Sequence, residues 1–214
     1  MSGRWGPEGP PDDAYSRVSD PQRFEGLHDV ADEILAELER RFDVTRSEAL
    51  GVDAELERGG VARPTIRLVP RNVAGAPIAV SFTTFPGVRM RAGNWLVRGF
   101  PFCGCDACDE TIEGETRELK AMVEDVVAGR FREAIRITDD GAWLEQAFWG
   151  AEGSRSSGRS RLDMEKALSM VAGVTDAAPT WNAWPAKSAG FWRNEPRVRR
   201  VPGKPIPPGG PAGP

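Results

Sequence analysis

All three cysteines of this 214-residue chain lie in one short stretch, FPFCGCDACDE, at residues 100–110. Their spacing is C-x-C-x-x-C, at Cys103, Cys105 and Cys108. The C-x-x-C half can turn both of its sulfurs toward one point, and Gly104 lets the chain bend between the first two cysteines without a Cβ clash. Three thiolates are three of the four ligands of a tetrahedral zinc ion. The stretch therefore predicts a zinc-type metal site that lacks one protein ligand.

The fourth ligand of such a site must come from elsewhere in the chain or from water. The only histidine, His28, falls at the edge of the apolar stripe of a predicted helix, where it could face a neighbouring loop. Taken alone, a histidine in this position is more often a boundary or surface residue than a ligand. Three carboxylates lie closer in sequence and could bind an ion through oxygen: Asp106, Asp109 and Glu110.

The acidic neighbours also bear on the alternative chemistry, a thiol-disulfide oxidoreductase or redox sensor that uses Cys105 and Cys108. A reactive thiolate needs a nearby cation or helix N-terminus, and like charges raise the pKa of a thiol. A divalent cation reverses that effect, because the carboxylates then attract the ion and the ion deprotonates the thiols. The pattern favours a metal over redox chemistry, and a metal-free loop of three reduced cysteines stays open. Iron–sulfur clusters usually require four cysteines, and carboxylates are poor partners for copper(I).

Composition limits the class of protein. The net charge is −4, with both signs mixed along the chain, which argues against binding to nucleic acid or to an anionic membrane. There is no apolar run long enough for a membrane span and no signal-peptide pattern, so we expect a cytoplasmic protein, in which clustered thiols bind metal or do redox chemistry. P-loop, dinucleotide-binding and H-E-x-x-H patterns are absent, so the sequence leans away from an enzyme. A protein partner for the aromatic and arginine-bearing surfaces is the first expectation, and a small-molecule module on the sheet face is a weaker one.

The elements that must position the cysteines indicate an α+β fold, with an antiparallel meander and hairpin sheet packed by two main helices. Apolar residues at helical spacing predict a helix over residues 20–44 and a second over 111–129. Alternation predicts strands between residues 62 and 98 and a hairpin over 131–149. The stretch EGSRSSGRSR, residues 152–161, has the composition of a flexible loop. A third, shorter helix follows it, with Leu168 and Val171 expected to face inward.

The ends of the chain differ in composition from its middle. We expect a flexible arm over residues 1–12, a single α+β domain over 13–195, and a disordered Pro/Gly-rich tail over 196–214. The segment PTWNAWP, residues 179–185, carries tryptophans that are expected to anchor the end of the domain in its core.

Three segments together resemble an uncharacterised actinobacterial family classed as a domain of unknown function. They are WGPEGPPDDAYSRVSDPQRFEGLH near the start, FPFCGCDACDE in the middle and WNAWP near the end. The cysteine stretch carries the most specific part of the likeness, which extends from residue 4 to about residue 187. The resemblance implies a bacterial cytoplasmic protein and supplies no catalytic residues.

Overall fold

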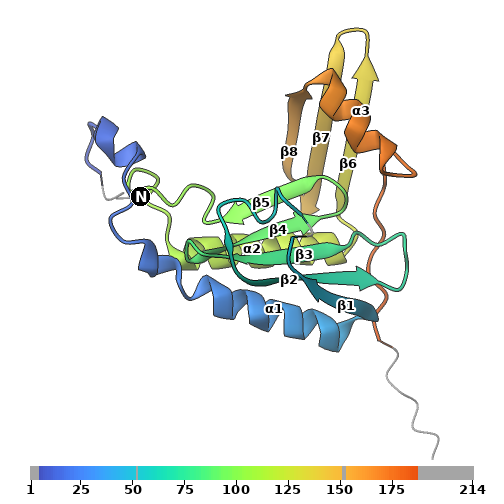
Figure 1. The fold of residues 1–214 in the computed structure, drawn as a ribbon, viewed down its shortest axis with the longest axis horizontal. Helices are drawn as coiled ribbons and strands as arrows, with labels where there is room; N and C mark the ends of the chain where they lie inside the picture. Colours follow the sequence, from blue (N-terminus) through green and yellow to red (C-terminus); the bar gives the residue numbers. More distant parts are fainter. Residues whose placement is uncertain (1–4, 52, 151–152, 188–214) are drawn as a thin grey trace, which may run out of the picture.

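The computed structural model describes residues 5–51, 53–150 and 153–187 and has the predicted α+β class. Its larger sheet is antiparallel, has five strands and follows the order β1-β2-β3-β4-β5 (Figure 1). These strands are β1 (Val44–Ala49), β2 (Val61–Pro70), β3 (Ile78–Thr83), β4 (Gly87–Ala92) and β5 (Leu96–Phe100). The spatial order equals the sequence order, so the predicted meander is confirmed. The edge strand β1 was not predicted.

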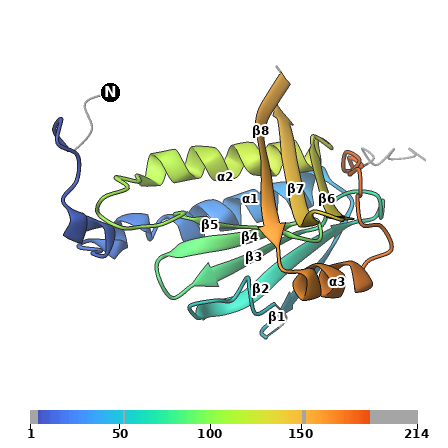
Figure 2. The same ribbon diagram turned by 90° about the horizontal axis from the view of Figure 1, so that it is seen from above.

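Two helices, α1 (Leu27–Arg41) and α2 (Ile112–Val127), cover one face of this sheet (Figure 2). Their apolar stripes pack on the alternate strand residues that the sequence placed on one face, including Ile78, Val80 and Phe82. The first helix is shorter than predicted, because a separate 3-10 turn at Pro21–Phe24 precedes it. Gly26 lies at the break, and a Cβ there would come within 2.7 Å of the Ile112 side chain. Glycine is a poor helix former, and here its small size lets the two helices approach.

A second, three-stranded sheet runs at a steep angle to the first (Figure 1). It contains β6 (Phe131–Thr138), β7 (Gly141–Gly150) and β8 (Gly153–Leu162). The hairpin β6–β7 is confirmed, whereas the prediction of a loop over residues 152–161 is wrong, since β8 pairs with β7 along most of its length. Serine and glycine are typical of loops, but every residue other than proline carries the backbone N–H and C=O groups that pair β8 with β7.

The third helix, α3 (Met164–Ala172), lies on the side of the five-stranded sheet opposite α1 and α2 (Figure 2). The side chain of Asp163 caps it by accepting a hydrogen bond from the backbone N–H of Lys166. Its buried residue is Ala167, which packs with Trp95 and Ile135, and Val171 packs beside them. The prediction for Leu168 is wrong, because that side chain is exposed. Small side chains let this short helix sit close to the three-stranded sheet.

Glu133 on β6 joins the two sheets. Its carboxylate accepts hydrogen bonds from the backbone N–H groups of Asn94 and Trp95, in the turn between β4 and β5, at 2.6 and 3.0 Å. It also accepts one from the indole of Trp181 at 3.2 Å. Trp181 and Trp184 are both buried in the main core, which confirms that the closing segment is an anchor. Burial raises the pKa of the Glu133 carboxyl above its ordinary value.

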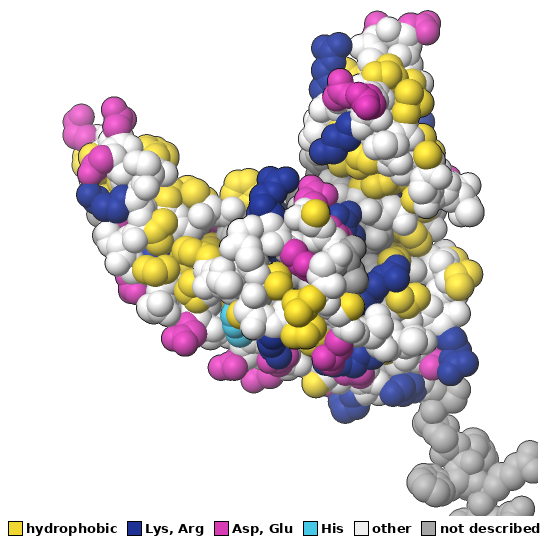
Figure 3. Space-filling model, in the orientation of Figure 1, with side chains coloured by type: hydrophobic (Ala, Val, Ile, Leu, Met, Phe, Trp, Pro, Cys, Tyr) yellow, Lys and Arg dark blue, Asp and Glu magenta, His cyan; other side chains and the backbone are white. Residues whose placement is uncertain are grey.

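The structure describes residues near the predicted N-terminal domain boundary but none near the predicted C-terminal boundary. Residues Asp12–Tyr15 form a short 3-10 turn in which Ala14 is fully buried. The predicted tail over 196–214, and the last residues assigned to the domain, lie outside the described part of the chain. Within the described part, no helix is both long and apolar enough to cross a membrane. Positive and negative side chains are interspersed over the face seen in Figure 3, as the composition indicated.

Candidate metal centre

The cysteines lie in the loop that joins β5 to α2. The Sγ atoms of Cys103, Cys105 and Cys108 all lie within 4.8 Å of one another, and the Cys105 and Cys108 sulfurs are 3.4 Å apart. Four sulfurs around a zinc ion, with Zn–S bonds of about 2.3 Å, would be about 3.8 Å apart. The three sulfurs therefore already have roughly the mutual spacing that one metal ion requires.

Glu110 holds the first half of this loop in shape. Its carboxylate accepts hydrogen bonds from three successive backbone N–H groups, those of Phe102, Cys103 and Gly104, at distances between 2.5 and 3.3 Å. The φ angle of Gly104 is +80°, a left-handed conformation that glycine adopts without a steric penalty. A Cβ at this position would lie 2.9 Å from the ring of Phe85. The predicted bend at Gly104 is therefore present, and Glu110 fixes it.

Residues 14–19, from the segment before α1, hold the second half of the loop. The backbone N–H groups of Asp106 and Ala107 donate to the carbonyls of Arg17 and Ala14. The Asp106 carboxylate accepts from the Ser19 hydroxyl at 2.5 Å, from the Ser19 backbone N–H at 2.9 Å and from the Arg17 guanidinium at 3.0 Å. The hydrogen bond from Ser19 is the main reason that the pKa of Asp106 lies well below its usual range.

Contacts among the three thiols shift the pKa values of Cys105 and Cys108, and a bound metal ion would favour the deprotonated form of all three. A hydrogen bond from Cys103 lowers the pKa of Cys105, and contact with Cys105 raises the pKa of Cys108 to about 12. The cluster on its own thus favours a thiolate at Cys105 and a proton on Cys108. A divalent cation compensates for the repulsion between thiolates and displaces the remaining protons.

The four residues predicted as a possible fourth ligand do not belong to the cluster that the three sulfurs form. His28 Nε2 lies 2.8 Å from the carbonyl oxygen of Gly87, and its ring packs edge-on against Phe82. Asp106 and Glu110 are engaged as described above, and Asp109 is exposed, with a φ of 50°. Among the residues that the structure describes, the ligand cluster at this loop consists of the three cysteines.

The two sides of the cysteine cluster differ in accessibility. Cys105 is buried, whereas Cys103 and Cys108 are exposed. An ion bound by all three sulfurs would therefore have solvent within reach on one side, where water or a group from another molecule could complete its shell.

Sequence reasoning missed the part that residues 14–23 play. Arg17 and Ser19 bind Asp106, and Arg23 donates to the carbonyl of Gly104 at 3.0 Å. The spacing of these residues carries no signal for the contact, since they lie more than 80 positions from the loop. Asp106 was predicted as a possible metal ligand, but its carboxylate binds Arg17 and Ser19 instead.

The cysteine loop lies within the span of a family that has no assigned activity. A family model described as "Family of unknown function (DUF6226)" matches residues 2–188, which span all of the described residues and are close to the span of the predicted resemblance. No curated protein and no solved structure matches the chain. The chain belongs to this family of unknown function, DUF6226.

Proposed function

We propose that this protein is a non-enzymatic domain in which Cys103, Cys105 and Cys108 bind a zinc-type ion. The observation that carries the proposal is the mutual distance of the three sulfurs, all within 4.8 Å, on a loop that hydrogen bonds hold from both sides. A soft thiolate set of this kind suits zinc better than magnesium or calcium, which prefer oxygen ligands.

The ion would have a structural effect at the junction of three elements. The loop ends β5, leads into α2 and binds residues 14–19, so an ion held there would stabilise their contact. Binding of metal to the folded chain adds directly to its stability, because the unfolded chain offers no preformed site.

A protein partner is the second part of the proposal. Large apolar side chains are exposed on the cysteine loop and on the segment bound to it: Phe102 is 75% exposed, Tyr15 60% and Val18 40%. Hydrogen bonds join these two segments, and exposed apolar patches are typical of surfaces that meet other proteins. A side chain from such a partner could supply the fourth ligand. We further propose that the protein acts in the cytoplasm, on the basis of its sequence.

The first test is the metal content of the untagged chain, purified without chelator and measured by elemental mass spectrometry. We expect close to one zinc per chain. Replacement of any one cysteine by serine should lower the zinc content and the melting temperature together, whereas Phe102→Ser, in the same loop, should keep the ion. Wild-type protein without metal but with three titratable thiols would contradict the proposal.

A specific contact favours redox chemistry as the second candidate function. The Cys105 and Cys108 sulfurs are 3.4 Å apart, and the pKa of Cys105 is lowered. A thiolate at Cys105 could attack a disulfide oxidant, and Cys108 could then resolve the mixed disulfide, releasing the oxidant as two thiols and leaving a Cys105–Cys108 disulfide. In that case Cys103→Ser should still form the disulfide in glutathione buffers, and Cys105→Ser and Cys108→Ser should not. The metal site, by contrast, requires all three cysteines.

A further inference from the structure

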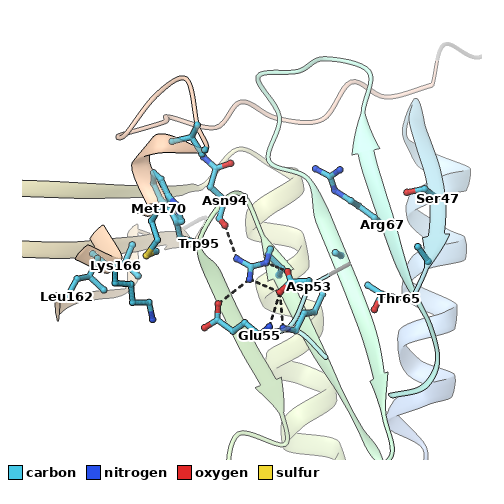
Figure 4. A pocket seen from close by; sticks show the side chains of 18 residues that line it. Ser47, Asp53, Glu55, Thr65, Arg67, Asn94, Trp95, Leu162, Lys166 and Met170 are labelled. Atoms are coloured by element: carbon cyan, nitrogen blue, oxygen red, sulfur yellow. Dashed lines mark hydrogen bonds and ion pairs between the residues drawn. The ribbon is translucent and has the colours of Figure 1, made fainter. Parts of the chain in front are cut away.

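A second candidate site lies on the face of the five-stranded sheet that α1 and α2 leave uncovered. There the sheet, the β6–β8 sheet and α3 enclose a pocket of about 650 Å³ (Figure 4). Its volume falls within the usual range of small-molecule sites, roughly 300–1,000 Å³. The pocket shares no lining residue with the cysteine loop, so it is independent of the proposed metal centre.

Small side chains in the middle of the sheet create the hollow. Strand register places Ser47, Arg67, Ala79 and Arg91 in one row across β1 to β4. Residues that pair across neighbouring strands point to the same face. Ala79 lies between Arg67 and Arg91 in this row. Its short side chain leaves a hollow in the floor of the pocket, and the long arginine side chains border that hollow on both sides.

Arg67 lies at one end of the pocket. Within the described part of the chain, its guanidinium makes no ion pair or hydrogen bond. The hydroxyl group of Ser47 lies on the same side of the pocket in Figure 4, whereas the hydroxyl group of Thr65 already donates to the Glu57 carboxylate at 3.0 Å. A guanidinium presents a fork of N–H donors that matches a carboxylate, and the Ser47 hydroxyl can add a further hydrogen bond.

The central arginine is already neutralised. Arg91 binds Asp53 at 2.5 and 3.1 Å and Glu55 at 3.1 Å, and it donates to the carbonyl of Asn94. Figure 4 shows Asp53 and Glu55 between Arg67 on one side and Lys166 of α3 on the other. The two carboxylates would repel a doubly charged phosphate more than a singly charged carboxylate. The charge pattern therefore favours a monoanion.

The other end of the pocket is apolar. Trp95, from the turn between β4 and β5, lies there with Leu162 and Met170, and Leu144 and Val174 complete the wall. Arg67 and Arg91 lie two strands apart, a spacing of about 10 Å, and the apolar wall lies beyond Arg91. A ligand that fills the pocket thus needs a charged head separated from an extended apolar body.

We propose that this pocket binds an organic monocarboxylate with an extended apolar body. The carboxylate pairs with Arg67, with the Ser47 hydroxyl beside it, and the body crosses the Ala79 floor to Trp95 and Met170. Lys166 lies at the opening of the pocket on α3 and is exposed, with no ion-pair partner among the described residues.

The test uses decanoate as the probe, below its micelle concentration, with the full-length chain in isothermal titration calorimetry. Decanol has the same body without the charge, and decyl phosphate carries a head of higher charge. We expect decanoate to bind at least about tenfold more tightly than either, as the loss of a charged hydrogen bond implies. Arg67→Gln should weaken decanoate by a similar factor and leave the affinity for decanol unchanged.

Two further variants separate the pocket from unspecific binding. Ala79→Leu fills the floor, so it should reduce the binding of both decanoate and decanol, with circular dichroism confirming that the variant folds. Arg40→Gln, on the opposite side of the sheet and 72% exposed at its side chain, should bind decanoate as the wild type does. Equal affinity for decanoate and decanol, an unchanged affinity in Arg67→Gln, or no binding of decanoate at all would overturn the proposal.

Discussion

The hydroxyl group of Ser19 lies 2.5 Å from the carboxylate of Asp106, although 87 positions separate the two residues in the chain. This contact joins the segment before α1 to the middle of the cysteine motif. Asp106 is 1% exposed at its side chain and also binds Arg17, so its negative charge is used within the fold.

Asp106→Asn should loosen the segment at residues 14–19. The amide that replaces the carboxylate loses the charge that attracts Arg17, and its NH₂ group faces donors instead of accepting from them. We expect faster amide hydrogen exchange at position 106, at Ala107 and in the segment up to Ser19, measured by mass spectrometry. Asp139→Asn, in the exposed β6–β7 turn, is the matched control and should leave this exchange unchanged. Equal protection in Asp106→Asn and wild type would mean that the backbone hydrogen bonds alone hold the segment.

Gly104→Ala should destabilise the folded chain by about 1–3 kcal/mol, because a left-handed residue with a side chain is strained. The Cβ would also lie 2.9 Å from Phe85. Urea unfolding followed by fluorescence measures the change. Gly158→Ala is the control, since nothing lies within 4 Å of a Cβ there and its φ is not left-handed. A Gly104→Ala variant as stable as Gly158→Ala would show that the loop adapts without cost.

Glu110→Ala should weaken zinc binding by about 10- to 100-fold, the usual effect of removing a group that orients metal ligands. The reason is that three successive backbone N–H groups, with that of Cys103 at their centre, lose their common acceptor. Competition with a chromophoric chelator gives the affinity. Glu113→Ala, which removes an exposed carboxylate in the first turn of α2, should change it little. An unaltered affinity in Glu110→Ala would exclude a positioning role for this residue.

Glu133→Gln should lower the free energy of unfolding by about 1–3 kcal/mol, because the amide nitrogen cannot accept a hydrogen bond, whereas both oxygens of the carboxyl group can accept one in the protonated as well as the ionised form. Burial raises the pKa of Glu133, so the folded chain holds this proton more tightly than the unfolded chain does. The stabilisation from Glu133 is then complete below about pH 4 and falls as pH rises through the raised pKa.

The measurement for Glu133 is denaturant unfolding of wild type and variant over a range of pH. The difference in stability between them should be largest in acid and smaller near neutrality. Glu165→Gln, in the exposed first turn of α3, should show no such trend. A difference that grows with pH would mean that the hydrogen bonds to the carboxylate outweigh its burial.

The helices and strands that could be predicted from the sequence are those in which buried and exposed positions carry apolar and polar side chains in a regular pattern. The stripes of α1 and α2 and the alternation of β2 to β4 each face one continuous core, so burial imposes a visible period. The strands β1 and β8 are mostly exposed where burial is described, and backbone pairing holds them at the edges of their sheets. Their sequences carry no period, and that is why both were missed.

The candidate site was predictable to the same limited extent. Local spacing was enough to bring Cys103, Cys105 and Cys108 together, because the motif spans a single turn. The partners of Asp106 come from residues 17 and 19, and the pocket beside Arg67 depends on α3 returning to the sheet. Contacts between common residues far apart in the chain leave no local pattern.

The order in which the chain is synthesised limits when residues 14–19 can contact the cysteine loop. These residues leave the ribosome well before residues 106 and 107, to which their backbone carbonyls bind. Domains generally fold as units, so a contact between distant parts of one domain forms once both parts have been made. This segment, although made early, can make these two hydrogen bonds only after the cysteine loop has been synthesised.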